Sequence, residues 1–146
     1  MKLESLLPHR GHMLLIDALL DWDDKTARAR AVMAPSHPFA LADGRVPATV
    51  GLEMMAQTVA AWAGVRGQDQ GEGPRVGYLL ACRSYDSEVA AFAAGSELEI
   101  RVEELIRQDN GFGSYRGEIH QGGECLARGR LSVMEQPPQA LSGENE

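Results

Sequence analysis

The chain has 146 residues, a length that suits one domain with a hydrophobic core of its own. Its formal net charge of −7 at pH 7 and its scattered Lys and Arg residues argue against a phosphate-binding face, so nucleic acid is not an expected partner. No apolar run reaches transmembrane length, and the N-terminus lacks a basic-then-apolar signal segment. We therefore expect a cytoplasmic protein without a membrane partner.

The first third of the chain predicts two strands followed by a loop. Residues 13–20 are mostly apolar and favour a strand, and residues 26–33 alternate between small apolar and basic or apolar side chains, which is typical of a strand with one open face. The polar turn between them predicts a hairpin. Residues 34–46 contain several turn formers and predict a loop.

A long apolar helix is predicted over residues 47–65. Pro47 suits a helix start, and Gly64 and Gly67 are plausible stop signals. The segment is apolar nearly all round, which indicates a buried helix rather than an amphipathic one. A glycine-rich polar loop over residues 68–74 is expected to follow it.

The remainder of the chain favours strands. They are predicted over residues 76–84, 97–107, 112–120 and 125–134, with turns at residues 109–111 and 121–124 and a disordered tail over residues 136–146. This order predicts an α+β domain over residues 1–135, in which an antiparallel sheet wraps around one long central helix. Such a sheet leaves exposed edges, so at least a dimer is expected.

The two cysteines, Cys82 and Cys125, stand alone in their segments. Without a C-x-x-C motif, and without two histidines at metal-ligand spacing on one helix, neither a zinc site nor a redox pair is predicted. The sequence favours two buried apolar thiols. No cofactor is predicted.

Glu53 is the first candidate for chemistry, because an acid placed about two turns inside an apolar helix is costly to bury unless it is paired or used. His37 lies upstream, and an acid with a histidine suffices for acid–base catalysis. The alternatives stay open. Glu53 could serve packing or a dimer contact, and His37 could make local loop hydrogen bonds. Gln57, one turn after Glu53, could support the acid or simply pack.

Two stretches carry a family resemblance. Residues 7–17, LPHRGHMLLID, resemble an L-P-H-R-x-x-x-L-L-V-D signature, and residues 47–57, PATVGLEMMAQ, resemble a P-G-x-x-x-[ED]-x-M-x-Q helix start. The chain resembles the hotdog-fold 3-hydroxyacyl-ACP dehydratases of fatty-acid synthesis over residues 5–134. Within them it is most similar to the dehydratase-like component of aryl-polyene gene clusters.

The resemblance implies a mechanism shared between two protomers. A histidine before the helix takes a proton from the carbon next to the thioester carbonyl, the helix acid protonates the departing 3-hydroxyl, and backbone N–H groups at the helix start stabilise the enolate. Glu53 matches the acid. Counting back from Pro47 without gaps places Phe39 at the histidine position, and His37 lies two residues earlier.

The helix start also departs from the family pattern, because Ala48 replaces its glycine. Ala48 still offers an N–H group for an oxyanion but crowds the approach of a thioester. The candidate oxyanion and substrate-binding residues are therefore Ala48, Gly51, Gln57 and Phe39. His9, His12 and His120 are interpreted as structural or surface residues.

Three functions remain open from the sequence. The leading one is dehydration of a 3-hydroxyacyl thioester on acyl carrier protein, by a homodimer or by a heterodimer with a hotdog paralogue. The second is acyl-thioester hydrolysis on the same fold. The third is a non-catalytic or half-site partner subunit of another hotdog dehydratase. Because acyl carrier proteins are acidic, docking requires local basic residues, for which the candidates are Arg10, Arg66, Arg75 and Arg83.

Overall fold

The computed structural model describes residues 14–69 and 76–136, with side chains for residues 14–66 and 79–134. Within these residues the chain forms one long helix, a six-stranded sheet and a pair of two-residue strands. The elements in chain order are β1 (Ala18–Trp22), β2 (Thr26–Val32), β3 (Val46–Pro47), α1 (Val50–Asp69), β4 (Val76–Ser87), β5 (Ala91–Phe92), β6 (Glu97–Arg107), β7 (Phe112–Gln121) and β8 (Glu124–Gln136).

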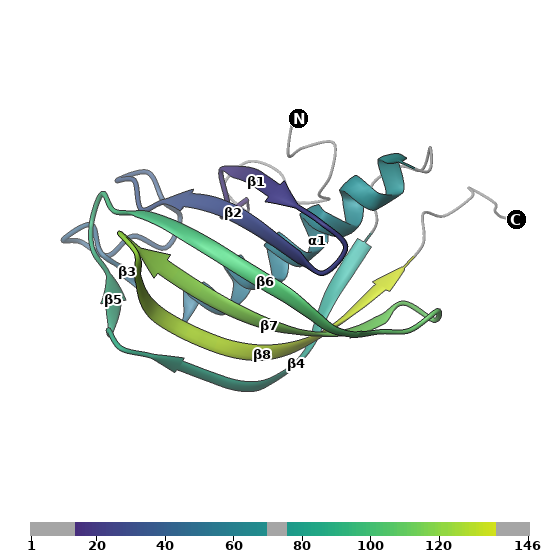
Figure 1. The fold of residues 1–146 in the computed structure, drawn as a ribbon. Helices are drawn as coiled ribbons and strands as arrows, with labels where there is room; N and C mark the ends of the chain where they lie inside the picture. The colour runs from purple at the N-terminus through teal and green to yellow at the C-terminus, as the bar shows by residue number, and fades with distance from the viewer. Residues whose placement is uncertain (1–13, 70–75, 137–146) are drawn as a thin grey trace, which may run out of the picture.

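The six-stranded sheet is antiparallel throughout, in the order β1-β2-β6-β7-β8-β4. Figure 1 shows α1 running along one face of this sheet, and the helix contacts five or more of its strands. β1 forms one edge, and β4 returns after the helix to form the other edge beside β8. The predicted α+β architecture, an antiparallel sheet wrapped around one central helix, is confirmed.

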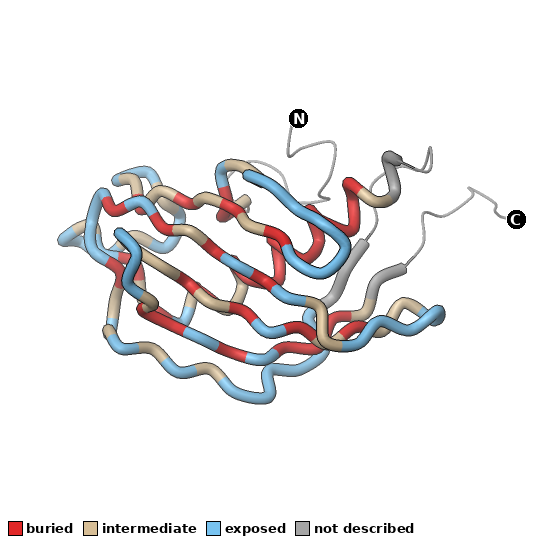
Figure 2. Tube along the Cα trace, viewed as in Figure 1, coloured by how far each residue is buried: buried red, intermediate tan, exposed pale blue. Residues whose placement is uncertain are grey.

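Alternating side chains along the strands separate the core from the outer face of the sheet. In β6, Leu98, Ile100 and Val102 are buried, whereas Glu97 before them and Arg101 among them are exposed. The same alternation runs along the neighbouring strands in Figure 2. Since successive side chains of a strand point to opposite faces, the apolar set packs against α1 and the charged set faces solvent.

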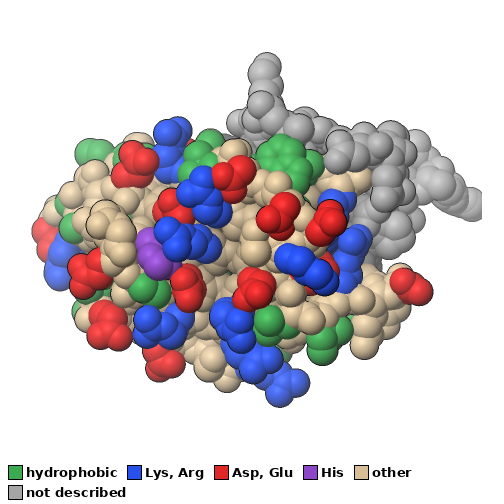
Figure 3. Space-filling view, in the orientation of Figure 1, with side chains coloured by type: hydrophobic (Ala, Val, Ile, Leu, Met, Phe, Trp, Pro, Cys, Tyr) green, Lys and Arg blue, Asp and Glu red, His purple; other side chains and the backbone are tan. Residues whose placement is uncertain are grey.

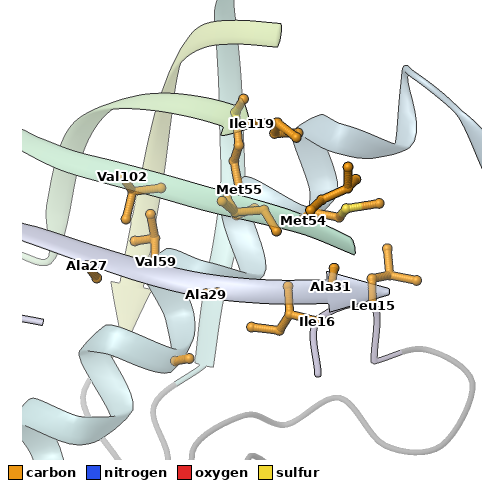
Figure 4. Packing of buried hydrophobic residues seen from close by; sticks show 14 of the residues in the cluster. Leu15, Ile16, Ala27, Ala29, Ala31, Met54, Met55, Val59, Val102 and Ile119 are labelled. Carbon is orange, nitrogen blue, oxygen red and sulfur yellow. The ribbon is translucent and has the colours of Figure 1, made fainter. Parts of the chain in front are cut away.

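The core lies between the helix and the inner face of the sheet. Figure 4 shows Met54 and Met55 of α1 among buried side chains from β2, β6 and β7, including Val102 and Ile119. Burial of side chains of this size contributes about 1.5–3 kcal/mol each. The inward positions of β2 are all alanine (Ala27, Ala29 and Ala31) and fully buried, so small side chains bring this strand close to the helix.

The helix begins three residues later than predicted. Val46 and Pro47 form β3 and pair with Phe92 and Ala91 of β5, so the proline belongs to a short strand and the helix starts at Val50. A strand of two residues gives no periodic signal. The pair β3 and β5 was therefore absent from the sequence prediction.

The helix also ends later than predicted. It continues through Gly64 and Gly67 to Asp69, and Gly64 is buried within it. A glycine inside a helix costs about 1 kcal/mol relative to alanine, and packing along the whole helix outweighs that cost. None of the described helical residues make a segment both long and apolar enough to cross a membrane.

The first strand was placed too early. Residues 13–20 were predicted to form it, but β1 runs from Ala18 to Trp22. Leu15 and Ile16 are buried, and the Leu15 N–H donates to the side chain of Gln57 instead of to a neighbouring strand. Their apolar character therefore reflects burial beside the helix rather than membership of the sheet.

The predicted hairpin turns are confirmed. Gly111 between β6 and β7 has φ 96°, and Gly122 and Gly123 between β7 and β8 have φ 58° and 88°. These left-handed backbone conformations favour glycine. The predicted tail lies outside the described residues, apart from Gln136, which ends β8.

The cysteine prediction is wrong. Both thiols are free, but Cys82 is exposed and Cys125 is half-buried. Cys82 lies on the edge strand β4. Cys125 is the second residue of β8 and lies on the outer face of the sheet. Neither residue therefore lies in the apolar core.

Candidate active site

Glu53 lies in the first turn of α1, not two turns inside the helix as predicted, because the helix begins at Val50. Its side chain is half-buried. The N-terminal end of a helix favours negative charge. Glu53 therefore places a carboxyl group at the end of the helix that favours negative charge.

A cavity of about 390 Å³ opens at Glu53. Its lining residues are Leu15, Phe39, Val50, Glu53 and Gln57. Three of the predicted site residues, Glu53, Gln57 and Phe39, are thus brought to one cavity. The loop before the helix supplies Phe39, which is 46% exposed, and the helix supplies the polar groups. The cavity is mostly apolar with a single carboxylate, a lining that suits an acyl chain better than a charged ligand.

Gln57 has a structural task at this cavity. It is buried, and its Oε1 accepts a 2.8 Å hydrogen bond from the Leu15 N–H. The bond joins the segment before β1 to the middle of the helix, so it fixes two walls of the cavity relative to each other. Gln57 therefore fixes the position of Leu15 at the cavity, one turn along the helix from Glu53.

The backbone at the helix start is only partly available for an oxyanion. The Ala48 N–H donates to the Ala90 carbonyl oxygen at 3.0 Å, and the Gly51 N–H donates to the Ala48 carbonyl oxygen at 2.9 Å. The expectation that Ala48 offers its N–H to substrate is therefore not met in this conformation. The N–H groups of Thr49 and Val50 have no acceptor among the described residues.

Tyr85 of β4 holds this helix start in place. Its hydroxyl donates a 2.5 Å hydrogen bond to the Ala48 carbonyl oxygen. Burial raises the pKa of Tyr85 to about 12, so the hydroxyl stays protonated and able to donate at neutral pH. Sequence reasoning missed Tyr85, because it belongs to no motif and reaches the helix from a strand 37 positions along the chain from Ala48.

Gly51 is required by that contact. A Cβ at this position would lie 2.3 Å from the Tyr85 hydroxyl oxygen and 2.6 Å from Cδ1 of Ile119. Both separations are far below van der Waals contact. The glycine predicted as part of the substrate site is therefore explained first by close packing against β4 and β7.

His37 lies in a turn beside the cavity but does not line it. Its Nδ1 accepts a 3.0 Å hydrogen bond from the Phe39 N–H, and the two rings lie 6.2 Å apart between centroids. Its Nε2 is buried without a hydrogen-bond partner among the described residues. Burial lowers the pKa of His37, although nearby Asp17 opposes the shift, so the ring is neutral at pH 7. Within one chain, the structure does not bring His37 and Glu53 to the same cavity.

Of the two candidate docking arginines that the structure describes, Arg66 is engaged in contacts within the chain and Arg83 is exposed. The Arg66 guanidinium lies 4.1 Å from the Trp62 ring centroid and 3.2 Å from Glu104, so it braces the end of the core. Arg83 is exposed on β4. The other candidates, and two of the predicted structural histidines, lie outside the described residues: Arg10, Arg75, His9 and His12.

Two comparisons identify the chain's relatives. The model of a family described as ApeP dehydratase (ApeP-like) matches residues 1–143. Among solved structures, the chain is similar to the dehydratase heterocomplex ApeI:P from Xenorhabdus doucetiae, with 31% sequence identity and a TM-score of 0.88. That match covers 93% of this chain and 91% of the other.

More distant structures share the fold alone. A conserved protein from Pseudomonas aeruginosa, PA5202, is 20% identical with a TM-score of 0.60, covering 81% of this chain and 86% of that chain. A hypothetical thioesterase from Streptococcus pneumoniae is 12% identical with a TM-score of 0.60, covering 84% and 88%. Among curated proteins, nothing matches. The family match and the 31% identical structure together show that this chain belongs to the ApeP-like dehydratase family.

Proposed function

We propose that the protein dehydrates a 3-hydroxyacyl thioester carried on acyl carrier protein to the 2-enoyl thioester, in fatty-acid-like or aryl-polyene biosynthesis. The observation that carries the proposal is the position of Glu53, which lines an apolar cavity in the first helical turn of an ApeP-like dehydratase. A 3-hydroxyacyl thioester fits such a lining because its chain is apolar and only its carbonyl and its 3-hydroxyl need polar contacts.

The proposed dehydration requires three groups: an acid, a base and an oxyanion site. A base takes one proton from the carbon next to the thioester carbonyl, and the electron pair moves toward the carbonyl oxygen. The C3–O bond then breaks, Glu53 gives its proton to the leaving hydroxyl, and the products are the 2-enoyl thioester and water. The N–H groups of Thr49 and Val50 are the proposed donors to the enolate oxygen, because they point from the helix start and have no acceptor among the described residues.

The base is proposed to come from a second subunit. His37 is neutral at pH 7, as a base must be, but it does not line the Glu53 cavity of its own chain. The similar ApeI:P structure is a heterocomplex. We therefore propose that this chain pairs with a hotdog paralogue or with a second copy of itself, and that Glu53 works with a histidine supplied by the other subunit.

The edge strand β4 is the proposed pairing surface. It is twelve residues long and bonds on one side to β8. Its described side chains from Leu79 to Ser84 are exposed, and Leu80 is 53% exposed. A long edge with exposed apolar side chains is a template for pairing with another strand. Arg83 on the same strand is the proposed contact for an acidic carrier protein.

A Glu53→Gln variant tests the acid directly. We expect turnover of a 3-hydroxyacyl-ACP, measured as 2-enoyl product by mass spectrometry in the presence of the hotdog partner, to fall by about 10²–10⁴-fold. Glu124→Gln, at an exposed glutamate beside the β7–β8 turn, is the matched control and should keep wild-type turnover. Full activity of Glu53→Gln would sink the proposed acid, and release of free thiol without enoyl product would identify a hydrolase instead.

Mixing two inactive variants tests where the base comes from. If two copies of this chain share the site, a mixture of His37→Asn and Glu53→Gln restores about a quarter of wild-type activity, because half of the dimers are mixed and each has one intact site. If a paralogue supplies the histidine, His37→Asn keeps its activity in the heterocomplex. A shared site would be contradicted if each variant is inactive alone, in the mixture and in its complex with the paralogue.

A further inference from the structure

A compact group of three metal-ligating side chains lies on the outer face of the sheet, away from the Glu53 cavity. Glu118 and His120 are two residues apart on β7, so they point to the same face. Cys125 of β8 is the direct cross-strand partner of His120, next to the Gly122–Gly123 turn. The hairpin therefore brings a carboxylate, an imidazole and a thiol to one place.

The donor atoms are already close together. One donor atom from each residue lies within 4.8 Å of the other two, and the His120 Nε2 lies 2.8 Å from Oε1 of Glu118. The His120 side chain is 12% exposed, and its Nδ1 is buried without a hydrogen-bond partner among the described residues. The imidazole therefore meets Glu118 through Nε2, the nitrogen that a bound ion would share with the carboxylate.

The surrounding charges leave these donors available. Glu99 is the cross-strand neighbour of His120 on β6, but its two oxygens accept from Arg28 and Arg101. Glu118 is 38% exposed and its carboxylate contacts His120. In Figure 3, which looks onto this side of the molecule, basic and acidic side chains alternate around one histidine. Arg101 and Arg128 are the cross-strand partners of Glu118, and they pair with Glu99 and Glu88, which offsets part of their positive charge.

We propose that Glu118, His120 and Cys125 bind Zn²⁺, with the fourth tetrahedral position open to water. Thiolate, imidazole and carboxylate are the ligands that zinc takes, at about 2.0–2.3 Å, and a tetrahedral site separates its donor atoms by roughly 3.3–3.8 Å. Binding replaces the proton of the Glu118–His120 hydrogen bond and releases the thiol proton of Cys125.

The sequence predicts no zinc site, because it contains neither a C-x-x-C motif nor two histidines at metal-ligand spacing on one helix. This site has a different spacing, i and i+2 on one strand plus a cross-strand residue. The ion would join β7 to β8 and brace the hairpin. Since none of the three ligands lines the Glu53 cavity, the site is independent of the proposed dehydration.

Titration of the chelator-treated full chain with Co²⁺, a spectroscopic substitute for Zn²⁺, tests the proposal. We expect a thiolate-to-cobalt charge-transfer absorption in the near ultraviolet that saturates at one equivalent and disappears when Zn²⁺ is added. Cys125→Ser should remove the absorption, whereas Cys82→Ser, the matched change at the other free thiol, should keep it.

Folding of each variant is checked by circular dichroism before the titration. If Cys125→Ser does not fold, His120→Gln replaces it and should weaken Co²⁺ binding by at least about tenfold. The proposal is overturned if the wild-type chain shows no charge-transfer absorption, if the absorption survives Cys125→Ser or depends on Cys82, or if His120→Gln binds Co²⁺ with wild-type affinity.

Discussion

The Tyr85 hydroxyl donates a 2.5 Å hydrogen bond to the carbonyl oxygen of Ala48, and this bond joins the edge strand β4 to the residue two positions before helix α1. The same Ala48 carbonyl also accepts from the Gly51 N–H. The Ala48 carbonyl oxygen therefore connects β4 to the first turn of α1, which carries Glu53.

Replacing Tyr85 by phenylalanine should lower stability in a way that depends on pH. The lost hydrogen bond costs about 1 kcal/mol in the free energy of unfolding at neutral pH. The pKa of Tyr85 is raised by burial from 10.0 to about 12, so the folded state holds the phenolic proton more tightly than the unfolded state. Its contribution to stability is full below pH 10 and is lost as the pH rises toward 12.

Urea unfolding at pH 8 and at pH 10.5 measures this contribution. The stability gap between wild type and Tyr85→Phe should be present at pH 8 and shrink at the higher pH. Comparing the two proteins cancels the titration of the other tyrosines. An equal gap at both pH values would show that the hydroxyl proton has no part in holding the helix start.

Gly51→Ala should destabilise the helix start by about 1–3 kcal/mol, because its Cβ would overlap the Tyr85 hydroxyl and Ile119. Thermal unfolding measures the loss. In the double variant with Tyr85→Phe, the removed hydroxyl relieves part of the overlap, so the two losses should sum to less than their separate values. If the two stability losses add in full, the overlap that destabilises Gly51→Ala does not involve the Tyr85 hydroxyl.

Gln57→Leu should lower the free energy of unfolding by about 1–3 kcal/mol, since the buried Leu15 N–H loses its acceptor. The cavity walls then lose their fixed spacing, and dehydration should fall with the stability. Gln108→Leu, at an exposed glutamine beyond β6, is the control and should change neither quantity measurably. Wild-type stability in Gln57→Leu would mean that Leu15 finds another acceptor.

Leu80→Lys should weaken association with the hotdog partner by at least about tenfold, or roughly 1.4 kcal/mol, because a charge replaces apolar surface on the proposed pairing strand. Leu20→Lys is the matched control: Leu20 is 42% exposed and lies on β1, at the opposite edge of the sheet. Analytical ultracentrifugation or calorimetry compares the two. A larger effect from Leu20 would move the interface to the β1 edge.

Much of the fold follows from periodicity along the chain. The alternation in β2 and β6 and the glycines of the β6–β7 and β7–β8 turns predict the hairpins, and the largely apolar run after residue 48 predicts a buried helix. The exact helix start could not be predicted. Pro47 reads as the beginning of a helix locally, and only its pairing with Ala91 on another segment places it in a strand.

The candidate site was half predictable for the same reason. Glu53 and Gln57 stand on one helix at fixed spacing, so their positions follow from the sequence. Tyr85 and the Leu15 N–H reach the site from other segments, through contacts that no local pattern carries. His37 depends on the path of a loop rich in turn formers, and its position relative to a second subunit is not a property of one chain.

The strand β4 has two sides with different duties. Its edge and exposed leucines form the proposed pairing surface, while the Tyr85 hydroxyl bonds to the backbone ahead of Glu53. A displacement of that strand would reorient the helical turn that carries Glu53 without any change in the residues that line the cavity. A subunit with a displaced β4 would thus keep all the proposed reactive groups but hold them out of alignment. A loss of activity would then indicate a loss of assembly before any change in the chemistry.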